Sequence, residues 1–110
     1  MFRSDDIKEI QKRVFELTLA LYRVTDFFPQ GEALKKSLRE KANEVFGLTA
    51  EYGYSGQDNG VSPILSKIQS VKGYLELARS MRFVRPINIT VLEREYDFLA
   101  DFFGRDIEHH

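Results

Sequence analysis

The most constraining feature of the sequence is an apolar repeat in its first thirty residues. Apolar side chains recur there at alternating spacings of three and four, which is the period of one face of an α-helix. Ser4 with Asp5 and Asp6 suits the start of a helix, and Pro29 with Gly31 stops it. We therefore predict a helix over residues 4–28 with a buried seam of Ile7, Ile10, Val14, Leu17, Leu21, Val24 and Phe28.

Three further helices are predicted from the same kind of spacing. The second spans residues 32–47, with Gly47 as its C-terminal glycine. The third spans 63–83, with Ser62 as N-cap and Pro63 in the first turn, and the fourth spans 91–103. The fourth helix is expected to begin at a capping box, Thr90 to Glu93, and to end before Gly104.

The segments between these helices complete the predicted organisation. Residues 48–62 contain three glycines and scattered polar residues, which predicts one long loop, and residues 104–110 are expected to form a tail. No strand-type alternation is present in the sequence. We predict a single all-α domain over 1–110, an antiparallel up-down four-helix bundle. Its core should bring six residues against the seam of the first helix: Leu38, Val45, Ile68, Val71, Leu75 and Leu99.

Composition excludes several kinds of chemistry. The chain has no cysteine, and its two histidines, His109 and His110, are its last two residues. Zinc–thiolate sites, iron–sulfur clusters and cysteine nucleophiles are therefore excluded, and a serine nucleophile would lack its usual base. Glu93, Asp97 and Asp101 share one helical face and are expected to face water rather than a metal. We expect no catalytic residue, no metal and no cofactor.

Location and termini give only weak signals. No apolar run is long enough to span a bilayer, and the first residues resemble neither a secretory signal nor a transit peptide. We expect a cytoplasmic protein with no membrane partner. His109 and His110 resemble the start of a purification tag and are given no role.

The first helix carries more apolar surface than one seam needs. Phe15, Leu19 and Tyr22 share a side that is rotated away from the seam. One interpretation is that the other helices cover this side, and the other is that it faces a second subunit. In the third helix, Ser70 and Gly73 belong to a row of small residues that would allow close approach of a helix from a neighbouring copy, or that simply faces water.

Charge is unevenly distributed, although the net charge is only −1. Basic residues gather in the second and third helices, whereas acidic residues dominate the fourth. These groups form solvated faces, contacts of opposite sign between subunits, or a surface for nucleic acid. The candidate nucleic-acid contacts are Lys35, Lys36, Arg39, Lys72, Arg79 and Arg82.

Two segments carry a resemblance to a known family. Leu21–Pro29, LYRVTDFFP, resembles the end of the first helix in the four-helix bundle proteins of ribosomal-RNA intervening sequences. Residues 66–79, SKIQSVKGYLELAR, resemble their third helix, and the accessory variability proteins of diversity-generating retroelements share that bundle. The resemblance implies an up-down bundle that assembles into rings, with pentamers expected. It also implies that a basic surface binds nucleic acid, as in the retroelement proteins.

Together these observations lead to two hypotheses about function. The first is a non-enzymatic helical bundle that forms homo-oligomers and acts as a scaffold or adaptor for another macromolecule, including a protein partner. The alternative is an accessory protein that binds nucleic acid through a basic surface on the second and third helices. Loss of affinity with rising salt would distinguish the alternative from the first hypothesis.

Overall fold

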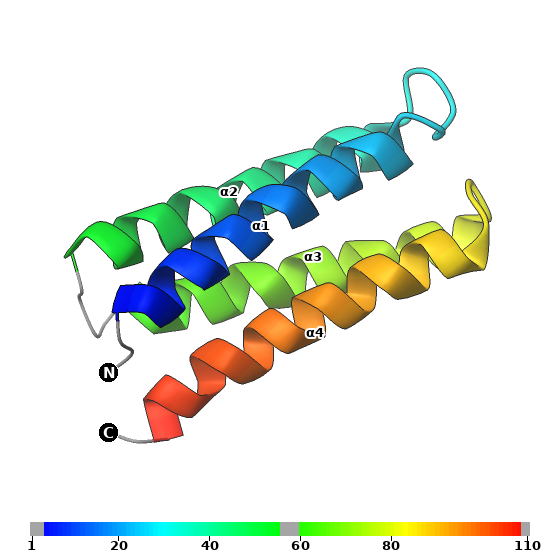
Figure 1. Ribbon diagram of the computed structural model, residues 1–110. Coiled ribbons are helices and arrows are strands. Elements are labelled where there is room, and N and C mark those ends of the chain that lie inside the picture. The colour runs from blue at the N-terminus through cyan, green and yellow to red at the C-terminus, as the bar shows by residue number, and fades with distance from the viewer. Residues whose placement is uncertain (1–3, 56–59, 109–110) are drawn as a thin grey trace.

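The fold is a bundle of four antiparallel α-helices (Figure 1). In the computed structural model, which describes residues 4–55 and 60–108, no strand occurs within these two ranges. The helices are α1 (Ser4–Thr25), α2 (Ala33–Ser55), α3 (Val61–Met81) and α4 (Pro86–Glu108). Helices that follow one another in the chain pack side by side, and the molecule measures 41 × 21 × 19 Å. The predicted all-α up-down bundle is confirmed.

The core is built from one apolar line on each helix. Within α1 the seam residues Ile10 to Leu21 are buried, while Ile7 and Val24 at its two ends are half-buried. Each of the other helices repeats the spacing of three and four and directs one stripe inward. All six residues predicted to pack against the seam are buried: Leu38, Val45, Ile68, Val71, Leu75 and Leu99.

The first helix ends at Thr25, three residues earlier than predicted. The Thr25 side chain is fully buried, and its hydroxyl donates to the carbonyl of Leu21 at 2.9 Å. The backbone N–H groups of Phe27 and Phe28 then bond to carbonyls three residues back rather than four, with Phe28 N bonded to Thr25 O at 3.0 Å. A threonine hydroxyl that competes for helix carbonyls loosens the last turn. Phe28 still enters the core, so its burial was predicted correctly although it lies outside the helix.

The second helix extends eight residues beyond its predicted end at 47. Gly47 lies inside α2, and the predicted loop 48–62 is helical in residues 48–55 and again from Val61; residues 56–59 lie outside the described part. Thr49 and Tyr52 continue the buried line of α2. Tyr52 packs edge-on against the Phe103 ring at 5.8 Å and lies against Gly60. Tertiary packing therefore holds the last two turns, which outweighs the cost of a glycine inside a helix.

The ends of α3 and α4 also differ from the prediction. α3 begins at Val61 with Gly60 as N-cap, so Ser62 and Pro63 lie in its first turn, and it ends at Met81 rather than at 83. Arg82 follows as the C-cap in the left-handed conformation, with φ 60°. α4 begins at Pro86, because a proline without an N–H fits the first turn of a helix.

An early start of α4 changes the role of the predicted capping box. Thr90 and Glu93 lie inside the helix, where both side chains bond to Arg79 of α3. Gly104 does not end α4, which continues to Glu108, so the predicted tail is helical up to that residue. Among the described residues, no helix is long and apolar enough to cross a bilayer.

Candidate functional site

A group of aromatic and aliphatic side chains left partly uncovered by the bundle lies where α1 and α2 meet. Phe15 is 51% exposed, Leu19 41% and Phe46 40%. The rings of Phe15 and Phe46 lie 6.2 Å apart, which joins the two helices into one apolar surface. We call Phe15, Leu19, Tyr22 and Phe46 the α1–α2 face. Apolar groups gathered on one side of a soluble protein are typical of an interaction surface.

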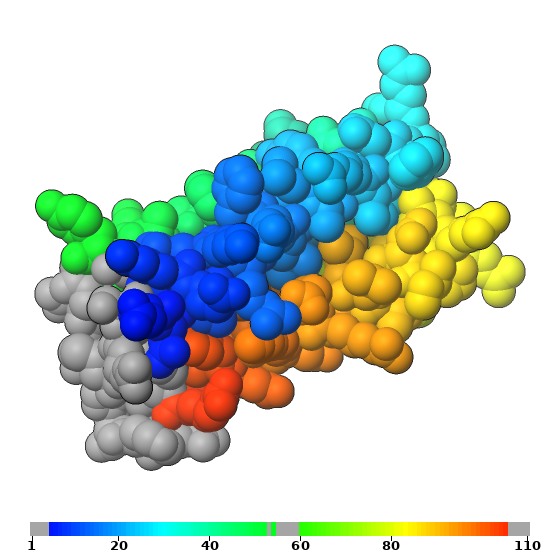
Figure 2. Space-filling view, viewed as in Figure 1, coloured from blue at the N-terminus to red at the C-terminus, as the bar shows by residue number. Residues whose placement is uncertain are grey.

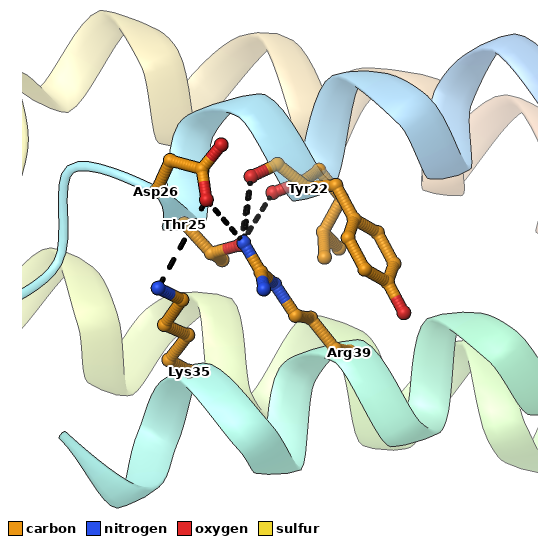
Figure 3. A network of polar contacts seen from close by, with 6 residues as sticks. Tyr22, Thr25, Asp26, Lys35 and Arg39 are labelled. Carbon is orange, nitrogen blue, oxygen red and sulfur yellow. Dashed lines mark hydrogen bonds and ion pairs between the residues drawn. The ribbon is translucent and has the colours of Figure 1, made fainter. Parts of the chain in front are cut away.

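Tyr22 differs from the other members of this face because polar contacts fix it. Its ring is half-buried under the guanidinium of Arg39 at 4.4 Å, and its hydroxyl accepts a hydrogen bond from Asn43 at 2.8 Å. Figure 3 shows Arg39 reaching from α2 to the end of α1, where it also binds Thr25 and Asp26. Tyr22 therefore forms a rigid edge of the face, while Phe15 and Leu19 form its apolar centre.

Phe46 is exposed although the residue before it, Val45, is buried. The buried line of α2 runs through Leu38, Ala42, Val45 and Thr49, and Phe46 lies beside it toward α1. Helical spacing accounts for this difference, since Phe46 is out of step with the buried line. A hollow of about 360 Å³ adjoins the two rings, lined by Gln11, Lys12, Val14, Phe15, Phe46, Thr49 and Ala50.

The small residues of α3 lie on its outer side. Gly73 is exposed, and a Cβ added there would meet nothing within 4 Å. Ser70 is half-buried, and its hydroxyl makes only a long bond of 3.5 Å to the Ser66 carbonyl. Nothing in the described part of the chain therefore requires a glycine at position 73. This row remains a candidate contact surface.

The candidate nucleic-acid contacts do not form one continuous surface. Lys35 and Arg39 turn toward α1, where both pair with Asp26, and Lys36 pairs with Glu40 on the exposed side of α2. Lys72 and Arg79 turn toward α4, where they pair with Asp97 and Glu93. The α1–α2 and α3–α4 contacts lie on opposite sides of the bundle. Arg82 is exposed at the turn between α3 and α4, with no ion pair to any described residue.

The contacts around Arg79 couple two carboxylates. Its guanidinium pairs with Glu93 and also with Glu76 at 3.4 Å. Burial and the neighbouring Glu76 raise the pKa of Glu93, although Arg79 opposes this. A hydrogen bond with Glu93, together with Arg79, lowers the pKa of Glu76. Because Arg79 is already shared by two acids, little of its charge is left for a phosphate.

A second uncovered feature lies between α1 and α4, which pack less extensively than the other neighbouring pairs. A groove of about 400 Å³ runs there over a floor of Leu17 and Leu92. Ala20 and the half-exposed Val91 form its apolar walls. Four charged residues line its rim: Glu9, Arg13, Glu16 and Glu95. We call this feature the α1–α4 groove; Figure 2 shows the two helices side by side on the side facing the viewer.

Acidic and buried polar side chains are the remaining candidates for a functional site. No group of three or more acidic or histidine side chains among them is arranged to hold a metal. Two buried hydroxyls, those of Thr49 and Tyr96, have no hydrogen-bond partner within the described ranges. Burial raises the pKa of the Tyr96 phenol, so it stays protonated and unsuited to act as a base at neutral pH.

The observed architecture agrees with the up-down bundle that the family resemblance implies, and membership of that family stays a prediction. In comparisons with known protein families, with curated proteins and with solved structures, nothing matches this chain.

Proposed function

We propose that this chain is a non-enzymatic four-helix bundle that associates with copies of itself and serves as a scaffold or adaptor for another macromolecule. The observation that carries this proposal is the exposure of Phe15, Leu19 and Phe46 on one side of a folded bundle. Removing such apolar surface from water favours association by roughly 25 cal/mol per Å² buried. In the single chain these side chains remain 40–51% exposed, so a role in contact explains them better than a role in folding.

The manner of association follows from where the surface lies. A ring of copies, as the family resemblance implies, requires a contact between two different surfaces that closes on itself. The α1–α2 face supplies one of these surfaces. Ser70 and Gly73 on α3 and the α1–α4 groove are the candidates for the other. A macromolecular partner would then bind the assembled particle rather than one bundle.

Leu19→Glu tests the proposal. A charge at the centre of the α1–α2 face should shift the protein from oligomer to monomer in sedimentation velocity at micromolar concentration. Leu19 is exposed in the single chain, so the helical signal in circular dichroism should be retained. Met81→Glu is the matched control, because Met81 is 52% exposed at the last residue of α3, away from the α1–α2 face and from both candidate receiving surfaces, and receives the same charge. If both variants sediment as the unmodified protein does, the α1–α2 face is not an association surface.

Nucleic-acid binding has less support from the geometry. Five of its six candidate side chains pair with acids, on different sides of the bundle. A labelled single-stranded RNA provides the test, in fluorescence anisotropy between 50 and 200 mM salt, the range over which phosphate contacts weaken steeply. We expect no saturable binding. Tight binding that weakens when Lys35, Lys36 and Arg39 are changed together to alanine would favour the alternative.

A further inference from the structure

We infer that the α1–α2 face of one copy docks into the α1–α4 groove of a second copy, so that each chain uses α1 twice. This inference rests on the proposed self-association and goes further by naming the receiving surface. The docking side would be the exposed ridge formed by Phe15 and Leu19. The receiving side would be the apolar floor and walls of the groove, with Val91 half-exposed beside Ala20.

The first support for this docking is the positive charge near the ridge of Phe15 and Leu19. Lys8, Lys12 and Arg23 are exposed and lie at helical spacing on the same outward side of α1 as Phe15 and Leu19. None of these three bases pairs with an acid in the described part of the chain. Asp5 lies on this side as well, so the ridge is apolar at its centre and carries three bases against one acid toward its ends.

Charge on the groove is complementary. Its rim carries Glu9, Glu16 and Glu95, and the only base there, Arg13, is occupied. Arg13 binds Glu95 at 3.2 Å and lies over the ring of Phe98 at 3.9 Å. Glu9 and Glu16 are exposed, with no basic partner among the described residues. An apolar groove with an acidic rim suits an apolar ridge whose ends are mainly basic, because both desolvation and charge then favour the contact.

The same charges disfavour pairing of the ridge with itself. In a two-fold pair with antiparallel α1 helices centred between Phe15 and Leu19, Lys12 of one copy would lie near Arg23 of the other. In a parallel pair, Lys12 would lie near Lys12. Like charges at a contact penalise that arrangement, whereas docking into the groove avoids it.

The outer row of α3 is a weaker receiving surface. Ser66, Ser70 and Gly73 would admit a helix closely but present no acid, and the nearest carboxylate, Glu76, is bonded to Arg79. The row lies along the outer side of a single helix rather than between two helices. Both charge and shape therefore favour the α1–α4 groove over the α3 row.

Single cysteines test this arrangement without background, because the chain has none of its own. Leu19→Cys and Val91→Cys both replace exposed side chains and should fold normally. A short bismaleimide should link an equimolar mixture of the two variants into a dimer. Each variant alone should give less than about a tenth of that yield, since position 19 would face position 91 of the neighbour.

Leu77→Cys, on the outer side of α3, is the matched alternative partner for Leu19→Cys. The masses of the same samples are measured by light scattering. Suppose that the protein is an oligomer, but that the cysteine at position 19 links to position 19 or 77 of the neighbour in preference to position 91. The docking inference is then wrong, and self-association stands. If the protein is a monomer, both are wrong.

A charge reversal provides a second readout. Glu16→Lys removes an acid from the rim and should raise the dissociation constant of the assembly about tenfold, as expected for replacing an attraction by a repulsion. Asp101→Lys makes the same change at an exposed position of α4 outside the groove and should leave the constant within about twofold. If the two variants raised the dissociation constant equally, the α1–α4 groove would not be the receiving surface.

Discussion

The guanidinium of Arg39 lies 4.4 Å from the centre of the Tyr22 ring and also donates to the Tyr22 carbonyl at 3.0 Å. One side chain of α2 thus binds both the side chain and the backbone of a residue in the last turn of α1. It also donates to the hydroxyl of Thr25 at 2.9 Å and to Asp26 at 2.7 Å. Arg39 therefore adds a further donor at a helix end where the Tyr22 carbonyl already accepts from Asp26 N at 3.1 Å, and so ties the end of α1 to α2.

Replacing Arg39 should destabilise the bundle and loosen the edge of the α1–α2 face. We expect Arg39→Ala to lower the free energy of unfolding by about 2 kcal/mol, since charged hydrogen bonds and a ring contact are lost together. Arg39→Lys should recover less than half of that loss, because an ammonium cannot make the forked contacts of a guanidinium. Urea unfolding followed by circular dichroism measures both; full recovery by lysine would mean that charge alone matters.

Substitutions at two leucines of α1 distinguish the buried side of this helix from its exposed side. Leu17 is 5% exposed, whereas Leu19 is 41% exposed on the opposite side of the helix. Leu17→Ala should cost about 2–5 kcal/mol, the usual range for a buried leucine. Leu19→Ala should cost less than about 1 kcal/mol in the monomer. Similar costs for the two variants in urea unfolding would show that the orientation assigned to α1 is wrong.

Replacing each of two glycines by alanine should change the stability of the bundle in opposite directions. Gly31 has φ +80° in the turn between α1 and α2, a conformation that disfavours any side chain, so Gly31→Ala should destabilise by about 1 kcal/mol. Gly47 lies inside α2 with free space around its Cβ position, so Gly47→Ala should stabilise by about 0.5–1 kcal/mol. Thermal unfolding checks both, and a destabilising Gly47→Ala would question the extension of α2 through this residue.

Glu44 should make the bundle more stable at neutral pH than in acid. Hydrogen bonds from Lys67 and then Lys41 lower the pKa of this carboxyl. A carboxyl whose folded pKa is depressed contributes stability above its unfolded pKa, and that contribution is lost as the pH falls through the folded value. Glu44→Gln should therefore lower the melting temperature at pH 7 and change it less at pH 3.

The control for this comparison is Glu40→Gln. Glu40 makes one contact of 4.0 Å with Lys36 on the exposed side of α2, whereas Glu44 links α2 to Lys67 of α3 at 2.9 Å. A melting-temperature difference for Glu44→Gln that stays constant from pH 7 to pH 3 would contradict the role assigned to this carboxylate. An equal effect of Glu40→Gln would do so as well.

The interior of each helix could be predicted from the sequence, but most helix ends could not. Burial follows the spacing of apolar residues, which is a local property, and the seam of α1 was therefore predicted correctly except at Ile7 and Val24, which are half-buried. The position at which a helix ends depends on contacts with residues that are distant in the sequence. Tyr52 holds the last turns of α2 by packing on Phe103, and Arg79 binds Thr90 and Glu93, which had suggested a helix start.

The candidate interface was predicted only in part, for a related reason. Helical spacing placed Phe15 and Leu19 on one outward side of α1, and both are exposed. It did not reveal Phe46, because that required knowing which side of α2 faces α1. The α1–α4 groove was not predicted, since it depends on how closely two helices far apart in the sequence approach each other.

The mass of the unmodified protein in solution tests the central claim most directly. Light scattering coupled to size exclusion, at micromolar concentration and moderate salt, gives that mass without reference to shape. The account predicts a homo-oligomer, with a mass that is a multiple of the 12.8 kDa chain. A single species at 12.8 kDa would contradict it and would leave the exposed Phe15, Leu19 and Phe46 without the role proposed for them.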